Sequence, residues 1–77
     1  MLSTYQEIRD RIYALARHHD LRPDWVESTR SSGLLLLYDR QRIAVARAIV
    51  PVRHMSPQVL AELEHQLEGV FGKDWME

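Results

Sequence analysis

The sequence predicts an α+β protein of two layers: an N-terminal helix, an antiparallel β-hairpin or three-stranded sheet, and a C-terminal helix. Apolar residues recur at helical spacing near both ends of the chain, whereas an apolar run followed by β-branched residues occupies the middle. The 77 residues are enough for one domain with a thin core. Helices that flank a sheet bury their apolar stripes against it, which gives two packed layers.

The first helix is expected over about residues 3–18. Ser3 or Thr4 can cap it, because Gln6 and Glu7 follow at the three-residue spacing of a capping box. The apolar side chains behind the cap share one face: Tyr5, Ile8, Ile12, Leu15 and Ala16. The helix should end soon after residue 18, because Pro23 disfavours helical backbone at the residue before it.

Residues 25–31 fit two structures equally well. They can form a first strand beside the hairpin. They can also form a short helix, with Pro23 in its first turn and Gly33 after its last residue. The sequence leaves this choice open.

The hairpin is expected to have strands over about residues 33–38 and 41–50. Asp39 and Arg40 form a two-residue turn in this interpretation, or part of a longer loop, because the glycine that favours the tightest hairpin turns is missing. The β-branched residues of the second strand favour extended structure. Its alanines leave a helix over residues 40–50 as the alternative.

The last helix is expected over about residues 57–71. Ser56 is a natural N-cap, Pro57 suits the first helical position, and Gly72 suits the position after the end. Between them the apolar side chains form a single stripe: Val59, Leu60, Leu63, Leu67, Val70 and Phe71. In the tail that follows, Trp75 either folds back onto the body or contacts a partner.

The hairpin is predicted to be apolar on both faces, which is unusual for a sheet with one side in water. Strand alternation places Leu34, Leu36, Ile43 and Val45 on one face. The other face holds Leu35, Leu37, Ala44, Ala46 and Ala48. We expect the larger first set to meet the helices and the second set to point outward. The alternative places one helix on each face and leaves nothing exposed.

An apolar face without cover predicts a partner. We therefore expect a non-catalytic protein–protein interaction module, in the form of a homodimeric adaptor, chaperone-like accessory or inhibitor protein. The expected contact residues are Leu35, Leu37, Tyr38, Arg42, Ala44, Ala46, Ala48 and Trp75. Within this set Tyr38 and Arg42 form an aromatic and polar rim.

Nucleic-acid binding is the alternative function. Residues 39–54 carry four arginines and one aspartate, a net charge of +3, whereas residues 55–77 carry five acidic residues and one lysine, a net charge of −4. The arginines could neutralise phosphates while Trp25 and Tyr38 stack on bases. A helix, three strands and a helix is an order similar to that of double-stranded RNA-binding domains. Those domains carry a basic second helix, however, and residues 57–71 are acidic.

Several other functions find no support in the sequence. The chain has no cysteine, which removes disulfides and thiolate metal sites. It has no glycine-rich phosphate loop or nucleophile elbow, and Glu62 and His65 form only one copy of a spacing that di-iron bundles use twice. We expect no catalytic residue, metal, cofactor or small-molecule substrate. So short a chain should also not enclose a ligand pocket of about 300–1,000 Å³ without a second subunit.

No stretch resembles a signal peptide, and the four consecutive leucines fall far short of the roughly 20 apolar residues that cross a bilayer. These features predict a cytoplasmic protein without a membrane partner.

Overall fold

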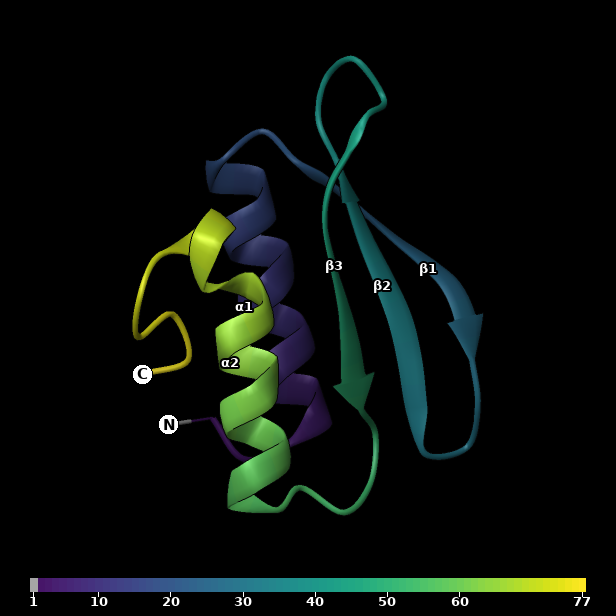
Figure 1. Cartoon of the computed structure of the whole chain (residues 1–77), viewed down its shortest axis with the longest axis vertical. Helices are drawn as coiled ribbons and strands as arrows, with labels where there is room; N and C mark the ends of the chain where they lie inside the picture. The colour runs from purple at the N-terminus through teal and green to yellow at the C-terminus, as the bar shows by residue number, and fades with distance from the viewer. Residues whose placement is uncertain (1) are drawn as a thin grey trace.

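The computed structural model describes residues 2–77. The elements follow the order α1 (Tyr5–His18), β1 (Arg22–Ser28), β2 (Ser32–Tyr38), β3 (Ala44–Pro51) and α2 (Pro57–Phe71). The strands form one antiparallel sheet in the order β1-β2-β3. Both helices lie on the same side of the sheet (Figure 1), and residue contacts join α1 to β1 and α2 to β3. The predicted α+β class is confirmed, and the segment that the sequence left open contains a strand.

The cap of α1 is the predicted capping box, with Thr4 as the N-cap. The Thr4 hydroxyl accepts a hydrogen bond from the Glu7 backbone N–H at 3.2 Å, and the Glu7 carboxylate accepts from the Thr4 N–H at 3.1 Å. The N–H of Ser3 also donates to this carboxylate, at 3.3 Å. These donors, the Ser3 N–H first among them, hold the pKa of Glu7 below its usual value.

The predicted signals also delimit α2. The Ser56 hydroxyl accepts from the Val59 N–H at 3.2 Å, and Pro57 is the first helical residue. Gly72 ends the helix at a φ of 95°, a conformation that a residue with a Cβ rarely adopts. Among residues 2–77, neither helix is long and apolar enough to span a membrane.

The core lies between the helices and one face of the sheet, which we call the inner face. The side chains of Leu35, Leu37 and Val50 on this face are fully buried, and that of Ala48 is 1% exposed. They pack against the buried stripes of both helices: Ile8, Ile12, Ala16, Leu60, Leu63, Leu67 and Phe71. The two faces of the hairpin are therefore the reverse of the prediction, since the alanine-bearing face is inside and the larger residues point outward.

Trp25 explains this orientation. It pairs with Leu35 and so belongs to the inner face. Its indole N–H donates to the Tyr13 hydroxyl of α1 at 2.7 Å. Its ring lies so close to Gly33 that a Cβ there would be 3.1 Å from the ring. A large aromatic on β1 thus fills the space beside glycine on β2, and the small alanines of β3 leave room for α2.

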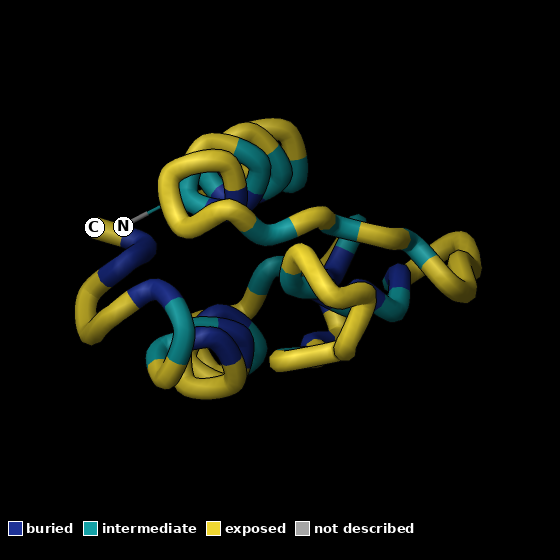
Figure 2. Tube along the Cα trace, turned by 90° about the horizontal axis from the view of Figure 1, so that it is seen from above, coloured by how far each residue is buried: buried dark blue, intermediate teal, exposed yellow. Residues whose placement is uncertain are grey.

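The C-terminal tail belongs to the core. Trp75 is 4% exposed, and its indole N–H donates to the Glu64 carbonyl of α2 at 2.9 Å. Met76 is fully buried, and its carbonyl accepts from the Leu2 N–H at 3.0 Å, so the two ends of the chain lie side by side (Figure 2). Of the two predicted alternatives for Trp75, the structure shows the fold back onto the body, because its apolar ring and polar N–H are both engaged within the chain.

The connection from β2 to β3 is the longer of the two predicted alternatives. The Asp39 carboxylate accepts from the N–H groups of Gln41 at 2.8 Å and Ile43 at 3.0 Å, which holds a loop rather than a two-residue turn. Arg42 takes a φ of 64° within this loop. The pairing then shifts by one residue between Leu37 and Tyr38, so β3 begins at Ala44.

Thr4→Ala is expected to lower the free energy of unfolding by about 1 kcal/mol, because it removes the hydroxyl that accepts the Glu7 N–H. Urea denaturation followed by far-UV circular dichroism measures the change. Thr4→Ser keeps the hydroxyl and serves as the control. Equal stability of the alanine and serine variants would contradict this account of the cap.

Candidate functional site

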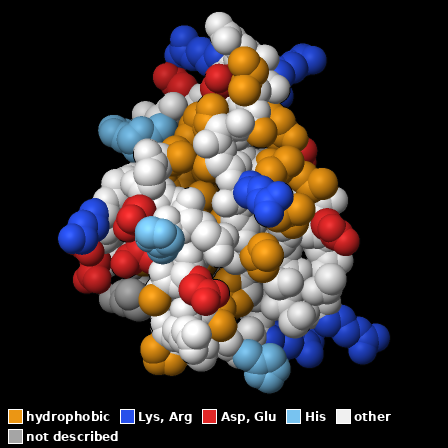
Figure 3. Space-filling view, in the orientation of Figure 1, with side chains coloured by type: hydrophobic (Ala, Val, Ile, Leu, Met, Phe, Trp, Pro, Cys, Tyr) orange, Lys and Arg blue, Asp and Glu red, His pale blue; other side chains and the backbone are white. Residues whose placement is uncertain are grey.

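The face of the sheet away from the helices, here called the outer face, carries an exposed apolar patch. Val26 of β1 is 52% exposed, and Val45 and Ile49 of β3 are 45% and 57% exposed. Leu34 and Leu36 of β2 are half-buried between these edges. Hydrophobic side chains gather over the strands in the space-filling view (Figure 3). The two helices therefore cover one face only.

Charged residues flank the centre of the outer face in a defined order. Leu36 pairs with Asp24 of β1 on one side and with Arg47 of β3 on the other. Both charged side chains are exposed. The next row of the sheet holds Glu27, Leu34 and Ile49. In these two rows the acidic groups are therefore on β1 and the basic group is on β3, whereas Arg22 of β1 pairs with Tyr38 in the row beyond Asp24.

The predicted contact residues do not form one surface. Leu35, Leu37 and Ala48 are buried on the inner face, and Ala46 is partly buried against the same core. Ala44 is exposed next to the β2–β3 loop. The expected contact face is therefore wrong for the buried residues, because the helices occupy the space in front of them.

Tyr38 and Arg42 lie together at one end of the sheet, around an open cavity of about 640 Å³. Its charged lining comes from the end of α1, the start of β1 and the β2–β3 loop: Arg17, Arg22, Arg40, Arg42, Asp20 and Asp39. We call this cavity the arginine cleft. Its volume is within the about 300–1,000 Å³ of usual ligand pockets. The sequence-based expectation concerned a pocket enclosed by the chain, whereas separate segments form this cavity at the surface.

One signal in the sequence could have identified the outer face. Arg47 alternates with Ala46 and Ala48, so it must lie on the opposite face from them. An unpaired arginine is too costly to bury beneath two helices. Its face must therefore meet solvent, and with it the neighbouring Val45 and Ile49.

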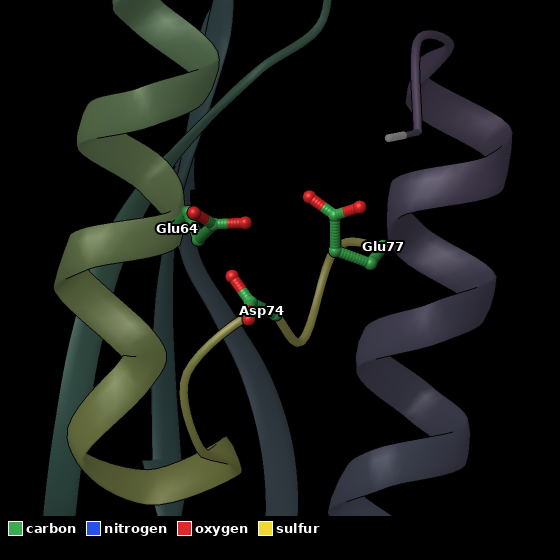
Figure 4. Close-up of side chains that lie close together, drawn as sticks. All are labelled: Glu64, Asp74 and Glu77. Carbon is green, nitrogen blue, oxygen red and sulfur yellow. The ribbon is translucent and has the colours of Figure 1, made fainter.

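Three carboxylates approach one another near the tail. Glu64 of α2 points toward Asp74 and Glu77, and their oxygens lie within 4.8 Å of one another (Figure 4). Exposed acidic groups commonly gather in this way without a bound ion, so the cluster alone does not indicate a metal site. His65 lies on the solvent side of α2, where its Nδ1 is 3.1 Å from the Glu68 carboxylate rather than beside Glu62.

A second polar cluster joins α1 to β1. The Arg9 guanidinium lies 5.1 Å from the centre of the Tyr13 ring, and Trp25 donates to the Tyr13 hydroxyl. Burial raises the pKa of Tyr13, but the Trp25 N–H and the Arg9 charge outweigh burial and bring this pKa below its usual value. The cluster fixes the orientation of Trp25 and hence of the sheet.

Comparisons with known proteins identify no relative. The chain matches no protein-family model, no curated protein and no solved structure. The function is therefore inferred from the geometry of the outer face and of the arginine cleft.

Trp25→Phe is expected to raise the pKa of Tyr13, because it removes the N–H that stabilises the phenolate. The ¹³C shift of the Tyr13 Cζ across an alkaline titration measures this pKa. The pKa of Tyr13 is lower in the folded state than in the unfolded state. The free energy of unfolding should therefore rise with pH between these two pKa values, and Tyr13 should add nothing to it at neutral pH. Trp75→Phe is the control, and an unchanged Tyr13 pKa in Trp25→Phe would contradict the assignment.

Proposed function

We propose that this protein is a non-catalytic interaction module that forms a homodimer through the outer face of its sheet. The observation that carries the proposal is the exposed apolar strip of Val26, Leu34, Leu36, Val45 and Ile49. Exposed apolar side chains that gather on one face, here with charged residues among them, are typical of interaction sites. The dimer would then act as an adaptor, accessory or inhibitor protein.

The edges of the sheet favour a face-to-face contact over the addition of another strand. On β3, the N–H of Ile49 donates to the side-chain oxygen of Gln66 from α2 at 2.9 Å. On β1, Pro23 lacks an N–H, and the register shifts at Val26. Prolines, bulges and covering elements protect sheet edges from further pairing. The outer face is the apolar surface that remains.

The charges on the outer face favour a second copy of this chain as the partner. A two-fold axis that runs along β2 between two outer faces places β1 of one copy over β3 of the other. Asp24 then faces Arg47 of the second copy, and the same pair forms twice. Asp24 and Arg47 lie on the strands next to β2, about 4.8 Å from the axis. Two packed sheets usually cross at about 30°, and at this distance the crossing shifts the two residues by only about 2–3 Å from direct opposition.

The size of the face predicts a weak dimer. Three strands about 4.8 Å apart and seven residues long, at about 3.3 Å each, present roughly 300 Å² of flat area. Two such faces together bury less than the about 1,200–2,000 Å² of standard stable interfaces, so we expect micromolar dissociation and a reversible dimer.

Ile49→Asp is expected to give a folded monomer, because the Ile49 side chain is 57% exposed and lies outside the core. Sedimentation velocity across a hundredfold concentration range should show wild-type protein shifting from monomer to dimer and the variant remaining monomeric. Ala14→Asp, on the exposed side of α1, is the matched control. A wild-type chain that stays monomeric up to millimolar concentration would overturn the proposal.

A charge exchange tests the arrangement within the dimer. Arg47→Asp places an aspartate opposite Asp24 of the second copy, and this happens twice in each dimer. At about 0.7 kcal/mol of lost binding free energy per pair, the dissociation constant should rise about tenfold. Adding Asp24→Arg should restore the wild-type dissociation constant. Failure of the double variant to recover, with wild type still dimeric, would reject the two-fold axis along β2 and retain the outer face as the interface.

A further inference from the structure

We propose that the arginine cleft binds a small molecule that carries a phosphate monoester. The cleft lies at the end of the sheet where α1 ends and the β2–β3 loop begins, at the top of the view in Figure 1. It shares no residue with the apolar strip, although Arg22 and Tyr38 form the row of the sheet beyond Asp24 and Leu36, and the proposal does not depend on the dimer.

Four arginines converge on the cleft from three separate segments. Arg17 is in the last turn of α1, Arg22 is the first residue of β1, and Arg40 and Arg42 belong to the β2–β3 loop. Basic side chains stand at this end of the space-filling view (Figure 3). Guanidinium groups present paired N–H donors that match phosphate oxygens, so a convergent set favours this class of anion.

The charges in the cleft are only partly neutralised by the protein. Asp20 forms an ion pair with Arg40 at 3.0 Å, and Asp39 accepts backbone N–H groups of its own loop. Within residues 2–77, Arg17, Arg22 and Arg42 make no ion pair. Four arginines against two aspartates leave a net charge of +2. A phosphate monoester carries about −1.5 to −2 at neutral pH, which this charge complements.

The remaining lining favours a ligand with an organic part. Tyr38 and Leu21 are half-buried in the wall of the cleft and offer an aromatic and an aliphatic surface beside the arginines. The volume of about 640 Å³ is large for an isolated phosphate ion and is typical of small-molecule sites. A nucleoside monophosphate has the required anion and ring, and is therefore the probe of choice.

The test is a titration of ¹⁵N-labelled protein with adenosine 5′-monophosphate at low ionic strength, followed by amide shifts. We expect saturable shifts in residues 17–22 and 38–42, and no such shifts with adenosine, which lacks the phosphate. Arg22→Gln should weaken binding about tenfold through loss of charge-assisted hydrogen bonds. Arg30→Gln removes the same charge from the β1–β2 connection, at the far end of the sheet from the cleft, and should leave binding unchanged.

Three results would overturn the proposal. Equal weakening by Arg22→Gln and Arg30→Gln would show general attraction to a charged surface. Equal shifts with adenosine and the monophosphate would show that the arginines do not hold the anion. Far tighter binding of a single-stranded RNA oligonucleotide, lost in Arg22→Gln, would assign the cleft to nucleic acid instead.

Discussion

Two helices on one side of a three-stranded sheet form two layers, so the second face of the sheet has no layer to cover it. In this chain the outer face carries Leu34, Leu36 and Ile49 at positions where an antiparallel sheet in water ordinarily has polar residues. Asp24, Glu27 and Arg47 are the charged exceptions along its middle rows. The proposed homodimer supplies the missing layer, and its symmetry brings the opposite charges together.

A small number of contacts select which face is covered. Trp25 joins β1 to α1 through Tyr13 and fills the space beside Gly33. Ala46 and Ala48 allow α2 to approach β3 closely. The C-terminal tail then closes the open side between the helices, where Trp75 and Met76 extend the core beyond the last helix. With these contacts in place, the larger apolar residues of the hairpin have only the outer face to occupy.

Local signals made the helices predictable, whereas the orientation of the sheet depends on contacts between distant residues. Pro57 and Gly72 mark the ends of α2 directly, because their backbone preferences act locally. Alternation predicted most of the hairpin residues that share a face, but not Ala44, which the register shift before Ala46 pairs with Tyr38. Side-chain size then placed the larger set in the core, which is the reverse of what the structure shows. The charge of Arg47 predicts the observed arrangement, with the face of Arg47 in solvent and that of Ala46 and Ala48 in the core. Burying an unpaired charge costs more free energy than packing small side chains against the helices.

The sequence could not decide between the two alternatives for the tail, and it did not indicate the arginine cleft, because both depend on contacts between distant segments. Trp75 is held by the Glu64 carbonyl, a backbone partner that no side-chain pattern reveals. Arg17 and Arg22 are separated from the loop arginines by two strands, and only the fold places them around one cavity. The residue types between β2 and β3 fit a two-residue turn as well as a longer loop. The hydrogen bonds that the Asp39 carboxylate accepts from Gln41 and Ile43 stabilise the loop.

The most direct measurement of the central claim is an isotope-filtered nuclear Overhauser experiment on a mixture of labelled and unlabelled chains at high concentration. The account predicts contacts between copies that join the methyl groups of Leu36 in both chains, and likewise those of Leu34. Contacts between copies that involve the exposed sides of the helices, with none from the methyl groups of the outer face, would contradict it.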